Sequence, residues 1–224
     1  MNDYDAKRCY LCGLESSDSV DHLPPKNLFL KKYRNIGADL ITVPAHIKCN
    51  KEHALDDEYF RYCLLVPAYW ESDYARELWN TKIKKQVHRT DSEGFRKYLL
   101  DKLASLEITT PSGIYLGEAE AAMLDAKRMI RVIERIARGI YYKHTEMILP
   151  LDWPVDVKLM SPAVRKDRIR IEKKGKFVSI GKGIFRYFWN YTNEDRRNGF
   201  FWFVFFDCVD FWVRTGVKTD NRKS

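Results

Sequence analysis

Residues 45–53 read AHIKCNKEH, and this stretch decides the fold expected for the N-terminal region. Histidine, cysteine and asparagine side chains lie close together in it. His46 and Cys49 are spaced as H-x-x-C, which lets a tight turn direct both side chains at one metal ion. Because a tetrahedral metal site needs four ligands, this pair requires a second pair elsewhere in the chain.

The second pair is Cys9 and Cys12, a C-x-x-C followed by Gly13, which tolerates the positive φ of a turn. Zn²⁺ prefers four thiolate or imidazole ligands in a tetrahedral arrangement. The sequence therefore predicts a structural zinc site, which would stabilise a region too short to build much core of its own. Its ligands are Cys9, Cys12, His46 and Cys49. The alternative is a redox-active C-x-x-C, but a thioredoxin-like motif follows a strand for which residues 1–8 leave no room.

The amino-acid composition indicates a globular protein and argues against the membrane and disulfide-rich classes. The chain has 224 residues, of which 45% are hydrophobic and 31% charged, so we expect a globular protein with a sizeable core. No apolar run reaches the ~18–20 residues of a membrane helix, and the polar N-terminus lacks the features of a signal peptide. The odd number of cysteines argues against a disulfide framework, and we expect a cytoplasmic protein without a membrane partner. The net charge of +8 favours nucleic acid as a partner.

The hydrophobic pattern predicts an α+β fold in two domains. Residues 1–62 form the Cys- and His-rich domain. Residues 63–224 form a second domain, helical to about residue 149 and built of strands over 150–216. Its longest expected helix is the amphipathic run 118–143, in which Gly139 marks either a break or close packing. The strands are expected at RIRIEKK, KFVSIGK, GIFRYFWNYT and FFWFVFFDCVDFWVRT, in an antiparallel, aromatic-rich sheet with FFWFVFF as a buried central strand.

Catalytic candidates lie between and beside the metal pairs. Asp21 and His22 precede two prolines. A neutral imidazole is the usual general base near neutral pH, and a carboxylate is a hard ligand suited to Mg²⁺. Asn50 follows Cys49 directly, so a second metal ion can lie between Asp21 and Asn50. The alternative roles are structural: Asp21 as a turn residue and Asn50 as a helix N-cap.

The order CYLC, VDHLPP, HIKCN resembles that of HNH (ββα-metal) endonucleases with zinc knuckles. In those proteins a C-x-x-C is followed by D-H or E-H before a proline, and then by a second knuckle with His or Asn directly after it. The resemblance covers about residues 7–62. Asn50 is followed by the acidic and aromatic stretch LDDEYFR, and a later helix ends in IARGIYYK. In these features most of the chain loosely resembles bacterial HNH-containing proteins of otherwise undefined type. The resemblance implies an N-terminal zinc-stabilised ββα-metal finger, a helical middle region and a C-terminal sheet.

The resemblance also implies an activity. The chain would be a hydrolase, a metal-dependent endonuclease acting on phosphodiester bonds, with DNA favoured over RNA. His22 would be the general base, and Asp21 and Asn50 would hold Mg²⁺ or Mn²⁺. Lysines near these motifs would contact phosphates; they are Lys26, Lys48 and Lys51.

Some positions of the motif stay open. His46 stands where cysteine is usual, a change that zinc tolerates. The middle polar residue of the motif is either Asp39 or Asn27. His53 and Asp57 lie one and two turns beyond Asn50 and are further candidates for the catalytic metal site.

A second function class fits the same residues. The N-terminal region can be a non-catalytic zinc-binding module that binds nucleic acid or a protein partner. In either case the C-terminal domain is expected to be an accessory part that targets or dimerises the protein, through a second copy or another protein.

Overall fold

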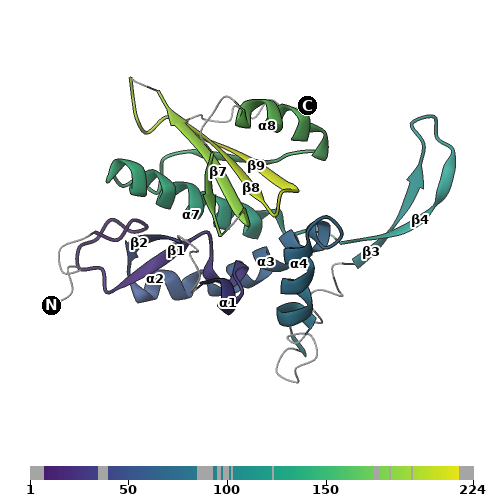
Figure 1. Cartoon of the computed structure of the whole chain (residues 1–224), viewed down its shortest axis with the longest axis horizontal. Coiled ribbons are helices and arrows are strands. Elements are labelled where there is room, and N and C mark those ends of the chain that lie inside the picture. The colour runs from purple at the N-terminus through teal and green to yellow at the C-terminus, as the bar shows by residue number, and fades with distance from the viewer. Residues whose placement is uncertain are drawn as a thin grey trace.

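The computed structural model in Figure 1 describes residues 8–34, 40–84, 93–94, 97, 101, 103–122, 124–173, 177–181, 183–192 and 194–216. The fold is α+β. In the N-terminal part, strands β1 (Ser19–Leu23) and β2 (Ile41–Ala45) form an antiparallel pair. Helices α2 (Ile47–Glu52) and α3 (Ala54–Ala68) follow directly. Between the two strands lie the 3₁₀ turn Lys26–Leu28 and the short helix α1 (Lys31–Arg34).

The C-terminal part is a five-stranded antiparallel sheet in the order β5-β9-β8-β7-β6. The predicted antiparallel, aromatic-rich sheet is confirmed, and so is the buried central strand, because β8 lies in the middle and its residues 201–205 are buried. The long run FFWFVFFDCVDFWVRT divides into two strands at a turn over residues 206–208. The strands are β5 (Val155–Leu159), β6 (Val178–Ile180), β7 (Phe185–Tyr191), β8 (Gly199–Phe205) and β9 (Val209–Thr215).

Helix α7 (Ala126–Thr145) joins the two parts, lying between the β1–β2 pair and the large sheet (Figure 1). Its apolar stripe, which includes Ile133, Ile136 and Ile140, is fully buried. One buried cluster contains residues from both parts of the chain, and the domain boundary predicted at residue 62 falls inside α3. Among the described helices, none combines the length and apolarity that crossing a bilayer requires.

Gly139 is a point of close packing and not a break, since α7 continues beyond it. A Cβ atom at this position would lie 2.0 Å from Cδ1 of Leu23 and 3.1 Å from Cε2 of Tyr10. Both neighbours are fully buried. The missing side chain therefore lets α7 approach the strand that carries Asp21 and His22.

Replacing Gly139 by alanine is expected to lower the free energy of unfolding by about 1–3 kcal/mol, because the added methyl group overpacks a filled core. Alanine's higher helix propensity, worth about 1 kcal/mol, offsets only part of this cost. Urea titration followed by circular dichroism measures the change. Gly94→Ala is the matched control, since Gly94 is helical and a Cβ there meets no atom within 4 Å. A Gly139→Ala protein as stable as the Gly94→Ala protein would contradict this packing.

The helical prediction for residues 63–149 is wrong at one place. Strands β3 (Leu103–Thr109) and β4 (Tyr115–Ala122) form a hairpin there, and α7 begins at Ala126 instead of residue 118. Gly113, at φ 85°, allows the chain to reverse between the strands. Asp125 then caps α7 by accepting a hydrogen bond from the backbone N–H of Arg128. The helices of this region that the structure bears out include α4 (Asp73–Leu78), which continues as the π-helical turn Trp79–Ile83.

The predicted strand RIRIEKK is also wrong, because its residues 168–172 lie in helix α8 (Arg165–Glu172). A 3₁₀ turn over Pro162–Val164 leads into it. Arg168 is buried and donates to both carboxylate oxygens of Asp210, which also accepts from the indole of Trp202. Alternating arginine and isoleucine mimicked a strand, but the buried ion pair with β9 fixes the segment as a helix lying on the sheet.

Candidate metal centre

Four soft ligands converge at the end of the β1–β2 pair. The ligand atoms of Cys9, Cys12, His46 and Cys49 all lie within 4.8 Å of one another. Zinc with Zn–S distances of about 2.3 Å would separate neighbouring sulfur atoms by about 3.8 Å, so a small contraction completes a tetrahedron. In the described part of the chain, this is the one group of three or more His, Cys, Asp or Glu residues that can hold a metal ion.

Local backbone structure directs each pair inward. A hydrogen bond of 2.9 Å from the backbone N–H of Gly13 to the carbonyl of Cys9 closes the Cys9–Cys12 loop. Gly13 has the positive φ of 74° that this turn requires. The backbone N–H of Tyr10 donates to the carbonyl of Pro44, 3.0 Å, and so ties this loop to β2. His46 is the N-cap residue of α2, and Cys49 lies one turn into that helix.

His46 is oriented as a metal ligand. Its Nε2 lies 3.1 Å from the carbonyl oxygen of Glu15, which can only accept, so Nε2 carries the proton. The other ring nitrogen, Nδ1, lies 3.3 Å from Sγ of Cys12 and 4.0 Å from Sγ of Cys49. A backbone carbonyl that fixes the ring and its tautomer is the usual support for a histidine bound to metal.

The cysteine thiols differ in acidity. Burial opposes ionisation of Cys9, but backbone hydrogen bonds from Cys12 and His46 outweigh it and lower the pKa of this thiol. Burial and the neighbouring charge of Cys9 raise the pKa of Cys49 to about 12. Ionising all the thiols together therefore requires a cation between them, so metal binding by this cluster should release protons.

Asp21 lies on β1 in a buried polar network beside the cluster. Its Oδ2 accepts a 2.5 Å hydrogen bond from the hydroxyl of Tyr10 and lies 3.6 Å from Nε of Arg135 on α7. Its Oδ1 accepts from the backbone N–H of His22, 2.8 Å. Burial and the Asp21 charge raise the pKa of Tyr10 well above its usual value, so the phenol stays a donor.

The same network contains Asp57, near the start of α3. Arg135 donates to its carboxylate, and Nδ2 of Asn27 donates to its backbone carbonyl, 2.8 Å. Burial raises the pKa of Asp57 to about 6, although Arg135 acts in the opposite direction. Burial, followed by the Arg135 charge, lowers the pKa of His53 at the junction of α2 and α3.

Asn50 bridges α2 to β1. Its Nδ2 donates to the carbonyl of Val20, 3.0 Å, which is the residue before Asp21. Its Oδ1 is buried and has no hydrogen-bond partner within the described part of the chain. A buried amide oxygen without a donor is uncommon, and it is a suitable ligand atom for a hard cation.

His22 and the basic candidates are less enclosed. His22 is half-buried, one residue before the end of β1, and strand alternation turns it to the face opposite Asp21, beside the exposed Thr42. The lysines proposed to contact phosphate are all exposed: Lys26, Lys48 and Lys51. The last two border a shallow depression with Asp18 and Glu52. Asp39, one candidate for the middle motif residue, lies outside the described residues.

Sequence reasoning missed the arginines of α7. Arg128 and Arg131 both donate to Asp56 through Nε, each at 2.7 Å, and Arg135 joins Asp21 and Asp57. These arginines recur at spacings of three and four, which puts them on one helix face. The spacing of the arginines could have been recognised in the sequence. No local pattern indicated that aspartates so distant in the chain would lie against this helix face.

Replacing Arg135 by methionine is expected to lower the free energy of unfolding by about 3–5 kcal/mol, since it leaves Asp21 and Asp57 buried without a cation. Arg131→Met is the matched control: the Arg131 side chain is 50% exposed, and Asp56 keeps Arg128. Its expected loss is below about 1 kcal/mol. Urea titration of both variants measures the difference, and equal losses would contradict the special position of Arg135.

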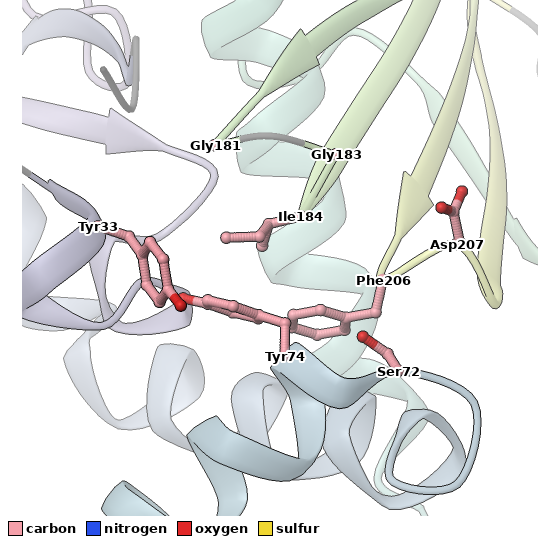
Figure 2. A pocket seen from close by; sticks show the side chains of 8 residues that line it. All are labelled: Tyr33, Ser72, Tyr74, Gly181, Gly183, Ile184, Phe206 and Asp207. Carbon is pink, nitrogen blue, oxygen red and sulfur yellow. The ribbon is translucent and has the colours of Figure 1, made fainter. Parts of the chain in front are cut away.

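A separate pocket of about 190 Å³ lies where α1 and α4 meet the large sheet (Figure 2). Figure 2 shows the rings of Tyr33, Tyr74 and Phe206 in a row along it; the last two are stacked, with centroids 6.1 Å apart. The Tyr74 hydroxyl accepts from the N–H of Leu30 and donates to the carbonyl of Leu28. The pocket is smaller than the ~300 Å³ of typical ligand sites, and its aromatic residues pack the two parts of the chain together.

Comparison with protein-family models, with curated proteins and with solved structures finds no significant match to this chain.

Proposed function

We propose that the chain is a metal-dependent endonuclease of the HNH type that hydrolyses phosphodiester bonds in DNA. The observation that carries the proposal is the position of Asn50. It directly follows a ligand of the Cys/His cluster, it contacts the strand that bears Asp21 and His22, and its buried Oδ1 lacks a partner among the described residues. A zinc-stabilised ββα finger, in which Zn²⁺ is structural and Asp21 and Asn50 hold Mg²⁺ or Mn²⁺, accounts for all three features.

The donor set fits a divalent ion. Among the described residues, each carboxylate oxygen of Asp21 accepts one hydrogen bond, which leaves each with a further lone pair. Asn50 offers an amide oxygen that no group in the described ranges contacts by a hydrogen bond. When bound, the ion supplies stabilisation of negative charge on the phosphate and on the leaving oxygen.

The chain's own residues have distinct roles in this proposal. His22 accepts a proton from the attacking water, and its half-exposed side chain is accessible to that water. Tyr10 and Arg135 fix the orientation of the Asp21 carboxylate. Lys48 and Lys51, exposed on α2, attract the phosphate backbone and provide affinity without base recognition.

A second candidate is a non-catalytic zinc module that binds nucleic acid or a protein. Two observations favour it: Asp21 already has a guanidinium beside it, and it lies on the face of β1 opposite His22. In this case the buried network would only fasten α7 to the finger.

The test is a nicking assay on supercoiled plasmid DNA with the full chain, together with its zinc content. The proposal expects about one zinc per chain and nicking that requires added Mg²⁺ or Mn²⁺. DNA binding that weakens with salt, without cleavage at any tested divalent ion, would instead support the non-catalytic module.

A further inference from the structure

The β3–β4 hairpin extends away from the rest of the described structure (Figure 1). Large apolar side chains are exposed along it, including Leu106 at 55%, Ile108 at 45% and Leu116 at 64%. A two-stranded hairpin is marginally stable by itself in water. Exposed apolar groups on a projecting hairpin therefore indicate a surface that another molecule covers.

The hairpin has two chemically different faces. Strand alternation puts Leu106 and Ile108 on one face, and Ser105 and Glu107 on the other. Glu107 lies directly opposite Glu118, and both are exposed. Two like charges in direct cross-strand register destabilise a hairpin, unless a cationic group lies against them.

The charge of the hairpin selects the kind of partner. Residues 103–122 contain three glutamates and no lysine or arginine, a net charge of −3. Since the whole chain carries +8, the remaining residues carry +8 − (−3) = +11. This charge repels nucleic acid and anionic lipid, and it favours a basic protein surface.

Helix α8 offers such a surface. It exposes Ile169 by 50% and Ile171 by 38%, and the exposed cations beside them are Lys166, Arg170 and Lys173. The cations of α8 complement the face of the hairpin that carries Glu107 and Glu118. Figure 1 shows α8 on the outer side of the large sheet, apart from the hairpin of its own chain.

We propose that the β3–β4 hairpin of one copy docks against α8 of a second copy, and that the contact is reciprocal in a two-fold symmetric dimer. Reciprocity uses both complementary surfaces of each chain and closes the assembly at two copies. Each copy then contributes one hairpin and one α8 to the interface. The inference stands independently of the nuclease proposal, since none of its residues belongs to the metal centre.

The test is sedimentation velocity on the full chain over a concentration series, and it expects a dimer. Glu107→Lys with Glu118→Lys should weaken the dimer by about tenfold or more, and so should Lys166→Glu with Arg170→Glu. All four positions are exposed, so folding should be preserved, and thermal unfolding of each variant checks this.

Mixing the two charge-reversed proteins gives the decisive result. A lysine-bearing hairpin then meets a glutamate-bearing α8, and the native hairpin meets the native α8, so a mixed dimer should form with near-native affinity. A wild-type chain that is monomeric at about 100 µM would overturn the proposal. So would a dimer that both pairs of substitutions leave unchanged, or variants that fail to restore association when mixed.

Discussion

Replacing Cys49 by serine is expected to abolish metal retention and to unfold the segment that the Cys/His cluster holds together. The change removes one of four converging ligands. Apparent binding free energies of structural zinc reach about 10–16 kcal/mol in small domains, so its loss exceeds most single side-chain effects. Zinc content should fall from about one per chain to near zero, and limited proteolysis should cut within residues 8–52.

Two controls separate the metal ligand from its surroundings. Asn50→Ala changes the very next residue and removes a hydrogen bond to Val20, which costs about 1 kcal/mol, but zinc should be retained. Cys208→Ser makes the same chemical change at a half-buried cysteine outside the cluster. If Cys49→Ser kept its zinc, or if Asn50→Ala lost it equally, the division of roles between these neighbours would be wrong.

Replacing His22 by alanine is expected to lower the rate of metal-dependent DNA nicking by about 10²–10⁴-fold, the usual contribution of a general base. The side chain is half-buried near the end of β1 and outside the Cys/His cluster, so zinc content should be unchanged. Single-turnover cleavage of supercoiled plasmid at saturating enzyme measures the chemical step separately from DNA binding.

His144→Ala is the matched control for the loss of an imidazole. His144 is exposed, and its partners, Tyr187 and Trp189, lie on β7. Its nicking rate should stay within about threefold of wild type, since the removed group has no place in the proposed chemistry. Nicking by His22→Ala at the wild-type rate would remove His22 from the base role and favour the non-catalytic module.

The features that could be predicted from sequence are those with a local signature. Spacing within the two short motifs identified Cys9, Cys12, His46 and Cys49, because a turn brings residues three apart together wherever it occurs. The central strand β8 was equally readable, since an unbroken aromatic run of its length can be buried on both faces of a sheet.

The features that were missed depend on contacts distant in sequence. In α8, the alternation of arginine and isoleucine suggested a strand, and only Asp210 on β9 shows why Arg168 is buried in a helix. Within the predicted amphipathic helix, no local pattern distinguished Arg135 from the other polar positions. Its two partners, Asp21 and Asp57, lie more than seventy residues earlier in the chain.

The close approach of α7 to β1 at Gly139 has a consequence for how this protein can be divided. A fragment ending at residue 62 would cut α3 and would remove the helix that covers Leu23, Tyr10 and the Asp21 carboxylate. The Cys- and His-rich segment is therefore not expected to fold as an independent domain. Fused to a foreign protein, it would need a new helix with a small residue and an arginine one turn apart. A substitution in β1 at this contact must therefore be accompanied by a compensating substitution in α7, and the reverse also holds.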